Sequence, residues 1–440
     1  MLTTSFQNQL NETLGEIEKA GLYKKERQIA SAQDAEITLQ DGRRVLNMCA
    51  NNYLGLSNHP EVCEAARQAI SDYGFGLASV RFICGTQTLH RQLEEALSAY
   101  LGTEDTILYP SCFDANGGLF ETLLTAEDAV ISDSLNHASI IDGARLARAE
   151  VAVFRHGDVE SFAETLAEVR PRARRILVVV DGVYSMDGDV APIAEIVKRA
   201  HERDAFVLLD DAHGTGTLGP RGRGTGEAAG VLGEIDIVMG TLGKSLGSFG
   251  AFVAGSAKLR ELLVNTARSF IFSCALAPAQ VEAARVALRL VDEEPWRRER
   301  LQTRCDRLRD RLAAAGISTA PSTTHVLPVL LGDNARTMAV CERLLERGYY
   351  AQGIRHPSVP HGTARLRITP MATHEDAEID GLAEAIVGIV AELPGEPPIQ
   401  PLTDPRAGTP TSTPAKPGPA AGRGSRSERA AAPTGPTGAC

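Results

Sequence analysis

The 440-residue chain has no long hydrophobic run, few aromatic residues and no concentration of positive charge. A membrane-spanning helix needs about 20 consecutive apolar residues, and no such stretch occurs, so we expect no membrane partner. The N-terminal segment also lacks the apolar core of a secretory signal. Lysine and arginine total 45 against 56 acidic residues, a net charge of −11. With no basic patch, nucleic acid is not expected as a partner.

The eight cysteines show neither the spacing of a disulfide framework nor that of a zinc site. They stand at positions 49, 63, 84, 112, 274, 305, 341 and 440, with no C-x-x-C pair among them. Several lie in apolar surroundings, so we expect reduced thiols in a cytoplasmic protein and no metal centre.

Short apolar strands and helices alternate between residues 60 and 293. Runs such as ILVVV (176–180) and AFVLL (205–209) are apolar throughout, as in a parallel sheet that is covered on both faces. The expected strands are 105–109, 129–133, 151–154, 176–181, 206–210, 236–240 and 250–254. The expected helices are 60–72, 90–100, 115–124, 138–147, 158–168, 191–203 and 256–267. The pattern predicts an α/β fold on a large, mostly parallel sheet.

The flanking segments predict a smaller α+β domain and a tail. A helix is expected over 5–20 and a hairpin around Asp41-Gly42, and further helices and strands follow the central region. The tail is rich in Pro, Gly, Ala, Ser and Thr, a composition typical of disorder. The predicted parts are an N-terminal helix and hairpin that pack with the small domain (1–50), a large domain (51–290), a C-terminal small domain (291–394) and the disordered tail (395–440).

Lys244 stands in a glycine-rich loop directly after an apolar strand. In IDIVMGTLGKSLGSFG (235–250), glycines at 240, 243, 247 and 250 flank it. An amine held in a dry pocket has a lowered pKa and can form a Schiff base with an aldehyde cofactor. Taken alone, such a lysine is more often a surface residue, so the neighbouring strands decide how it is interpreted.

The segment 214–219 matches the G-x-G-x-x-G pattern of dinucleotide-binding folds. That pattern requires a helix N-terminus beneath the pyrophosphate. Here DDAH (210–213) separates the glycines from the strand, and PRGRGTG (220–226) follows in place of a helix. We therefore do not expect a nicotinamide cofactor.

Polar residues follow four of the expected strands, at the ends where an open parallel sheet binds its ligands. They are His137, Ser185, Asp210 with His213, and Lys244. Each alone has an ordinary explanation as a helix cap, a turn residue or an ion-pair partner. Together they favour a pyridoxal 5′-phosphate (PLP) site, in which an acid keeps the pyridine nitrogen protonated, a ring stacks on the cofactor and a lysine holds its aldehyde.

The same interpretation requires donors for a phosphate group. SCFDANGG (111–118) lies at a strand-to-helix junction, where backbone N–H groups at the start of a helix bind anions. Thr241, three residues before the lysine, can add a hydroxyl.

The motifs around these residues resemble the α-oxoamine synthases, PLP enzymes of fold type I that condense an amino acid with an acyl-CoA. The likeness covers the chain up to about residue 393 and leaves out the tail. The motifs that carry it are NNYLGL (51–56), SVRFICGTQ (79–87), SCFDANGG (111–118), SLNHASIIDG (134–143), DGVYSMDG (181–188), DDAHGTG (210–216), GTLGKSLG (240–247) and GTARLRIT (362–369).

The resemblance implies a role for each matching residue. Lys244 would form the Schiff base and remove the glycine α-proton, and Asp210 would pair with the pyridine nitrogen. His137 would stack on the ring and polarise the thioester, a task that His213 could also perform. Ser185 and His213 would contact the phenolic oxygen of the cofactor.

The resemblance also implies a homodimer whose active site lies at the subunit interface. Cys112, Phe113 and Thr241 would bind the phosphate, together with Ser273 from the neighbouring subunit. Arg367 would hold the substrate carboxylate, with Asn51 close to it. Alternation along the strand independently places Arg365 and Arg367 on one face.

Different parts of the chain resemble different branches of the family. VRFICGTQ (80–87) and FDANGGLFETLL (113–124) are similar to the 2-amino-3-ketobutyrate CoA ligase (glycine C-acetyltransferase) branch, which implies glycine and acetyl-CoA as substrates. GIRHPSVPHGTARLRIT (353–369) is more similar to the decarboxylating branches, 8-amino-7-oxononanoate synthase and 5-aminolevulinate synthase, which use other acyl-CoAs. Two further alternatives are a non-catalytic subunit, which would typically lack the lysine, and a plain aminotransferase.

Overall fold

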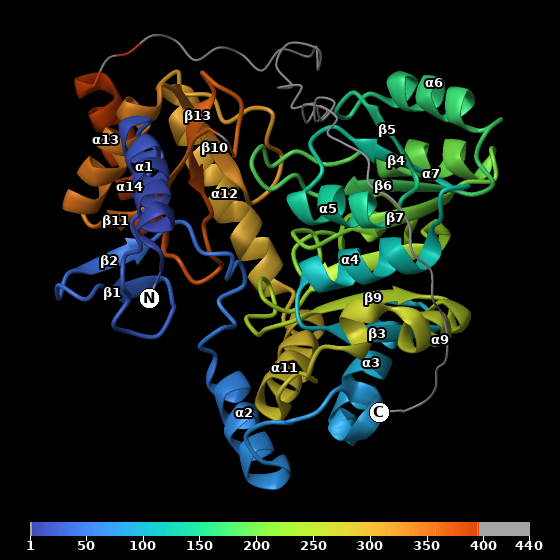
Figure 1. Cartoon of the computed structure of the whole chain (residues 1–440). Helices are drawn as coiled ribbons and strands as arrows, with labels where there is room; N and C mark the ends of the chain where they lie inside the picture. Colours follow the sequence, from blue (N-terminus) through green and yellow to red (C-terminus); the bar gives the residue numbers. More distant parts are fainter. Residues whose placement is uncertain (1, 357, 394, 396–440) are drawn as a thin grey trace. The chain divides into compact units, whose positions relative to one another are not determined.

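A seven-stranded sheet forms the centre of the larger part of the chain (Figure 1). The computed structural model describes residues 2–356, 358–393 and 395. The strands, in the order in which they lie side by side, are β3 (Asp105–Tyr109), β9 (Ala251–Gly255), β8 (Ile237–Thr241), β7 (Phe206–Asp210), β6 (Ile176–Asp181), β4 (Ala129–Asp133) and β5 (Glu150–Phe154). Within this sheet β9 runs antiparallel to both of its neighbours, and the other pairs are parallel. The predicted mostly parallel sheet is confirmed.

Helices cover both faces of this sheet because its strands are apolar on both sides. Leu177 and Val179 of β6 pack into one cluster, and Val178 and Val180 pack into another. The first face is covered by α4 (Cys112–Leu123), α5 (Ala138–Leu146), α9 (Ala257–Thr266) and α10 (Arg268–Ile271). The second is covered by α3 (Thr88–Leu101), α6 (Val159–Val169), α7 (Ile193–His201) and α11 (Pro278–Glu293), with α2 (Pro60–Tyr73) against α11.

Two small sheets form the remainder. One has the order β10 (Leu327–Gly332), β13 (Ala364–Ile368), β12 (Gln352–Ile354), and the other β1 (Glu36–Thr38), β2 (Arg44–Asn47), β11 (Tyr349–Tyr350). Because β2 pairs with β11, the N-terminal hairpin joins the C-terminal region. The helices of this part are α1 (Thr4–Lys19), α12 (Trp296–Ala314), α13 (Asn334–Glu346) and α14 (Asp376–Glu392). The domain limits at 50, 290 and 394 stay predictions, and the predicted tail lies outside the described residues apart from Gly395.

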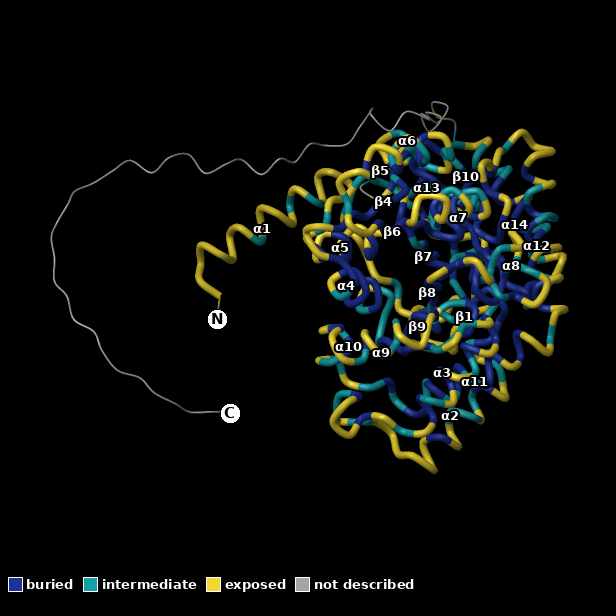
Figure 2. The backbone as a smooth tube through the Cα atoms, turned by 90° about the vertical axis from the view of Figure 1, so that its right-hand side faces the viewer, coloured by how far each residue is buried: buried dark blue, intermediate teal, exposed yellow. Residues whose placement is uncertain are grey.

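Burial follows this arrangement (Figure 2): the strands of the large sheet are mostly buried, whereas α1 has no buried residue. Residues 214–224 form turns and lead only to the four-residue α8 (Thr225–Ala228), so the G-x-G-x-x-G segment does not start a dinucleotide-binding helix. Among the described helices, none is long and apolar enough to span a membrane. The predicted cytoplasmic location stays a prediction.

Candidate active site

The candidate site lies where β3, β4, β6, β7 and β8 end at the same edge of the large sheet. Asp181 ends β6 and Asp210 ends β7, and the two are paired in the register of these strands. His137 follows β4, and Lys244 follows β8. The parallel arrangement therefore brings together residues that are more than 100 positions apart in the sequence.

Lys244 is half-buried in a tight loop. The loop is closed by two backbone hydrogen bonds, from Leu242 N–H to the Gly250 oxygen (2.9 Å) and from Ser248 N–H to the Leu242 oxygen (2.8 Å). Gly247 has φ +61°, and a Cβ there would lie 2.4 Å from the Ser57 nitrogen, so the loop packs directly against backbone. Burial lowers the pKa of Lys244, and Asp210 acts in the opposite direction. A lowered pKa favours the neutral amine that attacks an aldehyde.

Asp210 and Asp181 place two buried carboxyl groups beside this lysine. Their exposed fractions are 3% and 7%. Asn116 donates to Asp210 Oδ2 at 3.3 Å, and the His137 N–H donates to Asp181 Oδ2 at 2.7 Å. Burial raises the pKa of both carboxyl groups, and Lys244 opposes the rise at each. A cationic group bound beside them would favour their charged forms and so lower the pKa of both carboxyl groups.

His137 caps α5 and has a defined tautomer when neutral. The Ser139 N–H donates to its Nδ1 at 3.2 Å, and Ser139 Oγ lies 2.8 Å from the same nitrogen. Nδ1 is therefore an acceptor, so Nε2 carries the proton. Burial lowers the pKa of His137, and Asp210 opposes this. The Phe113 ring meets the imidazole edge-on, with ring centroids 5.8 Å apart.

The first turn of α4 offers backbone donors to an anion. Asp114 N–H donates to Ser111 Oγ at 3.2 Å, but the N–H groups of Cys112 and Phe113 have no acceptor within the described residues. Burial raises the pKa of the Cys112 thiol to about 12, so its side chain stays neutral. The Thr241 hydroxyl donates to the Gly250 oxygen at 3.1 Å and therefore braces the lysine loop. Its predicted contact with phosphate stays a prediction.

Arg367 is a buried guanidinium without an acidic partner among the described residues. Its side chain enters from β13 and is held by Ser185 and Asn51, through Nε to the Ser185 oxygen (2.6 Å) and Nη1 to Asn51 Oδ1 (3.2 Å). Arg365, on the same face of the strand, pairs with Asp187 instead. The alternation predicted for this strand is confirmed, and only Arg367 has its charge free for a ligand carboxylate.

Tyr53 and His325, which were not among the predicted site residues, lie beside Arg367 and His213. Tyr53 Oη lies 2.7 Å from His213 Nδ1 and 3.5 Å from Arg367 Nη2. His325 packs on the Tyr53 ring with centroids 4.1 Å apart, and its buried Nε2 has no partner in the described structure. Burial lowers the pKa of His325 to about 3 and that of His213 well below its usual range, so both rings are neutral. Tyr53 could have been found from the sequence, because it lies within the NNYLGL motif. None of the motifs contains His325.

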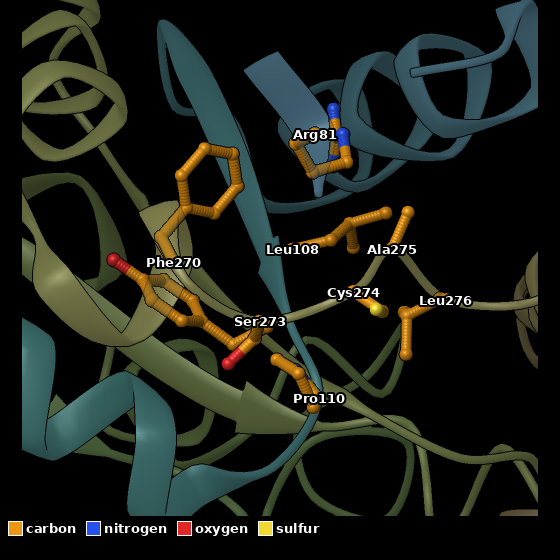
Figure 3. Close-up of a pocket in the computed structure, with 9 residues that line it drawn as sticks. Arg81, Leu108, Pro110, Phe270, Ser273, Cys274, Ala275 and Leu276 are labelled. Atoms are coloured by element: carbon orange, nitrogen blue, oxygen red, sulfur yellow. The ribbon is translucent and has the colours of Figure 1, made fainter. Parts of the chain in front are cut away.

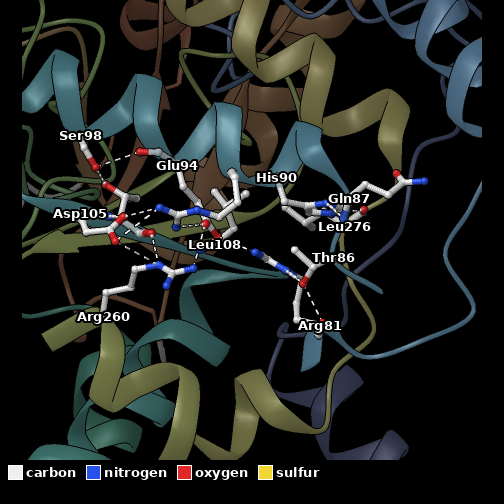
Figure 4. A network of polar contacts seen from close by, with 12 residues as sticks. Arg81, Thr86, Gln87, His90, Glu94, Ser98, Asp105, Leu108, Arg260 and Leu276 are labelled. Atoms are coloured by element: carbon white, nitrogen blue, oxygen red, sulfur yellow. Dashed lines mark hydrogen bonds and ion pairs between the residues drawn. The ribbon is translucent and has the colours of Figure 1, made fainter. Parts of the chain in front are cut away.

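Ser273 forms no hydrogen bond with these residues within the described chain. It lines a pocket with Arg81, Tyr109 and Phe270 (Figure 3). Arg81 is anchored to the fully buried Glu94 (Nη2 to Oε1, 2.9 Å), which also binds two further arginines (Figure 4). The predicted contact of Ser273 with phosphate across a subunit interface stays a prediction.

The residues present fit PLP. The free N–H groups at α4 suit a phosphate, and the two buried carboxyl groups suit a protonated pyridine nitrogen. Lys244 suits the aldehyde, and the His137 ring can lie against an aromatic face. Within the described residues there is no group of three or more His, Cys, Asp or Glu side chains that could hold a metal ion.

Comparison with known proteins leads to the same assignment. The family model for aminotransferase class I and II matches residues 43–386. The chain is 45% identical to 2-amino-3-ketobutyrate coenzyme A ligase of Escherichia coli (strain K12) over 390 residues, which cover 88% of this chain and 98% of that protein. It is 46% identical to 8-amino-7-oxononanoate synthase of Geobacter sulfurreducens over 382 residues, which cover 86% and 97%.

A solved structure supports the fold. Serine palmitoyltransferase from S. paucimobilis, with a bound PLP–myriocin aldimine, superposes with a TM-score of 0.83 at 31% identity. The match covers 89% of this chain and 99% of that one. The chain therefore belongs to the aminotransferase class I and II family and, within it, to the α-oxoamine synthases, with the fold type I of PLP enzymes.

Proposed function

We propose that this protein is a PLP-dependent acyltransferase that joins glycine to an acyl-CoA, with acetyl-CoA as the first expected donor, to give 2-amino-3-ketobutyrate and free CoA. The observation that carries the proposal is a half-buried Lys244 of lowered pKa in the same site as Arg367, a buried guanidinium with no acidic partner in the described chain. One side chain suits an aldehyde cofactor and the other a substrate carboxylate.

The chain's own residues supply binding, orientation and proton transfer. When bound, PLP withdraws electrons from the α-carbon of glycine and makes its proton acidic. Arg367 would hold the glycine carboxylate, and Lys244 would hold the proton that leaves the α-carbon. The α-carbon then forms a bond to the acyl carbonyl carbon, the thioester C–S bond breaks, and CoA leaves as a thiolate that takes up a proton.

His137 is the proposed donor to the thioester carbonyl oxygen. Its Nδ1 accepts from Ser139, so the proton on Nε2 is available for an oxygen that gains negative charge. His213 is less suited to this role because its Nδ1 is engaged by Tyr53 and the ring is buried.

A second candidate is a decarboxylating synthase that uses another acyl-CoA. It is favoured by the 46% identity to an 8-amino-7-oxononanoate synthase, which is as high as the identity to the ligases. Both candidates require the same lysine, acid and arginine, so these residues do not distinguish them. The candidates differ in the acyl-CoA and in the fate of the carboxylate.

We also propose a homodimer. Segments 79–85 and 272–275 lie side by side, joined by the Ala275 N–H to Ser79 oxygen bond of 3.1 Å. They expose Phe82 (61%), Ile83 (68%) and Phe272 (70%) around the pocket that contains Ser273. Exposed apolar side chains of this size favour burial against a second copy.

The deciding experiment is mass detection of the amino-ketone product and of released CoA, with glycine and a panel of acyl-CoAs. Acetyl-CoA turnover to 2-amino-3-ketobutyrate, or to its breakdown product aminoacetone, supports the first candidate. Turnover of a longer acyl-CoA with loss of CO2 supports the second. Lys244→Ala is the control and should abolish both products; normal turnover by that variant would contradict the proposal.

A further inference from the structure

His156 lies outside the proposed cofactor and substrate contacts, between two of the loops that form the site. It follows β5, with Nδ1 3.0 Å from Asp133 Oδ1 and Nε2 2.7 Å from Asp189 Oδ2. Its side chain is 24% exposed, against 1% for Asp133 and 19% for Asp189. The Tyr184 ring meets it edge-on at a centroid distance of 4.4 Å.

Both ring nitrogens of His156 are donors. A carboxylate is an acceptor only, so a ring with a carboxylate at each nitrogen satisfies both contacts as the imidazolium. Burial opposes the charge, but the hydrogen bonds to Asp133 and Asp189 outweigh it and raise the pKa of His156 to about 10. The ring is therefore a charged cross-link at neutral pH.

Each acid belongs to a different loop of the site. Asp133 ends β4, four residues before His137, and its carboxylate also accepts the N–H groups of Leu135 (2.8 Å) and Gly157 (2.9 Å). Asp189 closes the loop after β6, because its backbone oxygen accepts the Tyr184 N–H at 3.1 Å. His156 thus joins the loop that carries His137 to the loop that carries Ser185.

The second loop reaches Arg367 directly. The Ser185 oxygen accepts from Arg367 Nε at 2.6 Å, and Asp187 in the same loop pairs with Arg365. A shift of this loop would therefore move the acceptor that orients the Arg367 guanidinium.

We propose that His156 is a positioning residue: by bridging Asp133 and Asp189 it fixes the His137 and Ser185 loops relative to each other and so orients Arg367 toward the substrate carboxylate. The expected effect on substrate binding rests on the proposed function, whereas the bridge from Asp133 through His156 to Asp189 does not.

The test compares His156→Gln with a matched control, His201→Gln, in the holoenzyme. His201 Nε2 also contacts a carboxylate, Asp236 Oδ2, at 3.0 Å. This pair lies where β7 and β8 begin, away from the strand ends that carry the site. His156→Gln should raise the KM for glycine about tenfold, the size of one lost charge-assisted hydrogen bond, with little change in the KM for acyl-CoA. The control should leave both constants unchanged. An unchanged glycine KM in His156→Gln would overturn the proposal.

Hydrogen exchange of the holoenzyme provides a readout that does not depend on turnover. In His156→Gln, peptides that contain Leu135 and Gly188 should both exchange faster, although they are far apart in sequence. Faster exchange that is confined to residues 155–158 would overturn the bridge. If the wild type forms no product from glycine, the proposed function fails while this measurement still decides the bridge.

A double variant guards against a general loss of stability. Asp189→Asn alone should raise the glycine KM like His156→Gln, and the two together should raise it no further, because both remove the same bridge. If the double variant instead raises the glycine KM by the product of the two single effects, the residues act separately and the proposal is overturned. If His156→Gln does not fold, Asp189→Asn alone carries the test: a raised glycine KM supports the bridge and an unchanged one overturns it.

Discussion

Arg367 Nε donates to the backbone oxygen of Ser185 at 2.6 Å and so connects a small sheet to the large one. Arg367 lies on β13 of a small sheet, whereas Ser185 follows β6 of the large sheet. The candidate carboxylate site is thus shared by both sheets, and its geometry depends on how they are held together.

Arg367→Lys should raise the KM for glycine about tenfold to a hundredfold, because lysine offers a single point charge where arginine offers a fork of donors. Steady-state kinetics at varied glycine and fixed acyl-CoA would measure this. Arg365→Lys is the matched control, since Arg365 already pairs with Asp187. That variant should lower the melting temperature and change the glycine KM less. Equal effects of both variants on the glycine KM would argue against a special role for Arg367.

Asp210→Asn should weaken retention of PLP at least about tenfold, since a neutral amide cannot balance a protonated pyridine nitrogen. Dialysis followed by absorbance of the bound cofactor would measure the loss. The control is Asp211→Asn, because the Asp211 carboxylate accepts from Thr225 N–H (2.8 Å) and from its hydroxyl (2.6 Å). It should lower stability and leave cofactor retention nearer to that of the wild type. Normal retention by Asp210→Asn would contradict the assigned role.

Gly247→Ala should destabilise the lysine loop by about 1–3 kcal/mol, because the residue has positive φ and its Cβ would meet the Ser57 nitrogen at 2.4 Å. Gly230→Ala is the control: φ is +74°, but nothing lies within 4 Å of the added Cβ. In chemical denaturation, Gly230→Ala should lower the free energy of unfolding less than Gly247→Ala does. Only Gly247→Ala should also weaken the binding of PLP. Equal costs would show that the contact with Ser57 is relieved by a small shift.

The contribution of His156 to stability should depend on pH. Its pKa is raised to about 10 in the folded protein, so the stabilisation is fully present below the unfolded value of about 6.5 and is lost as the pH rises through 10. The difference in melting temperature between wild type and His156→Gln should therefore be largest near pH 6 and shrink toward pH 10. A difference that stays constant over this range would mean that His156 is not a charged bridge.

Phe82→Glu should weaken the proposed homodimer, because a charge would replace an apolar side chain that is 61% exposed in one chain. Sedimentation or light scattering at several protein concentrations would show the shift toward monomer. Leu262→Glu, at a residue of α9 that is 42% exposed, is the control and should leave the assembly unchanged. A Phe82→Glu variant with wild-type association would place the interface elsewhere.

Much of the site could be predicted because it follows strands with a strong local signal. β4, β6 and β7 are continuous apolar segments, and the predicted bounds coincide with 129–133, 176–181 and 206–210. Polar residues at the ends of parallel strands must meet at one edge, so Lys244, Asp210 and His137 could be placed together without coordinates. Ser273 could not be placed in this way, because its predicted partner lies on another subunit.

The sequence by itself determined the alternation of strands and helices, the lysine after β8 and the family, because each depends on short stretches of neighbouring residues. Only the tertiary structure decided which arginine has a free charge, that Tyr53 and His325 border the candidate carboxylate site, and that His156 joins two of its loops. These contacts connect segments that are distant along the chain. They depend on the packing of loops and sheets against one another, which periodicity and local composition do not specify.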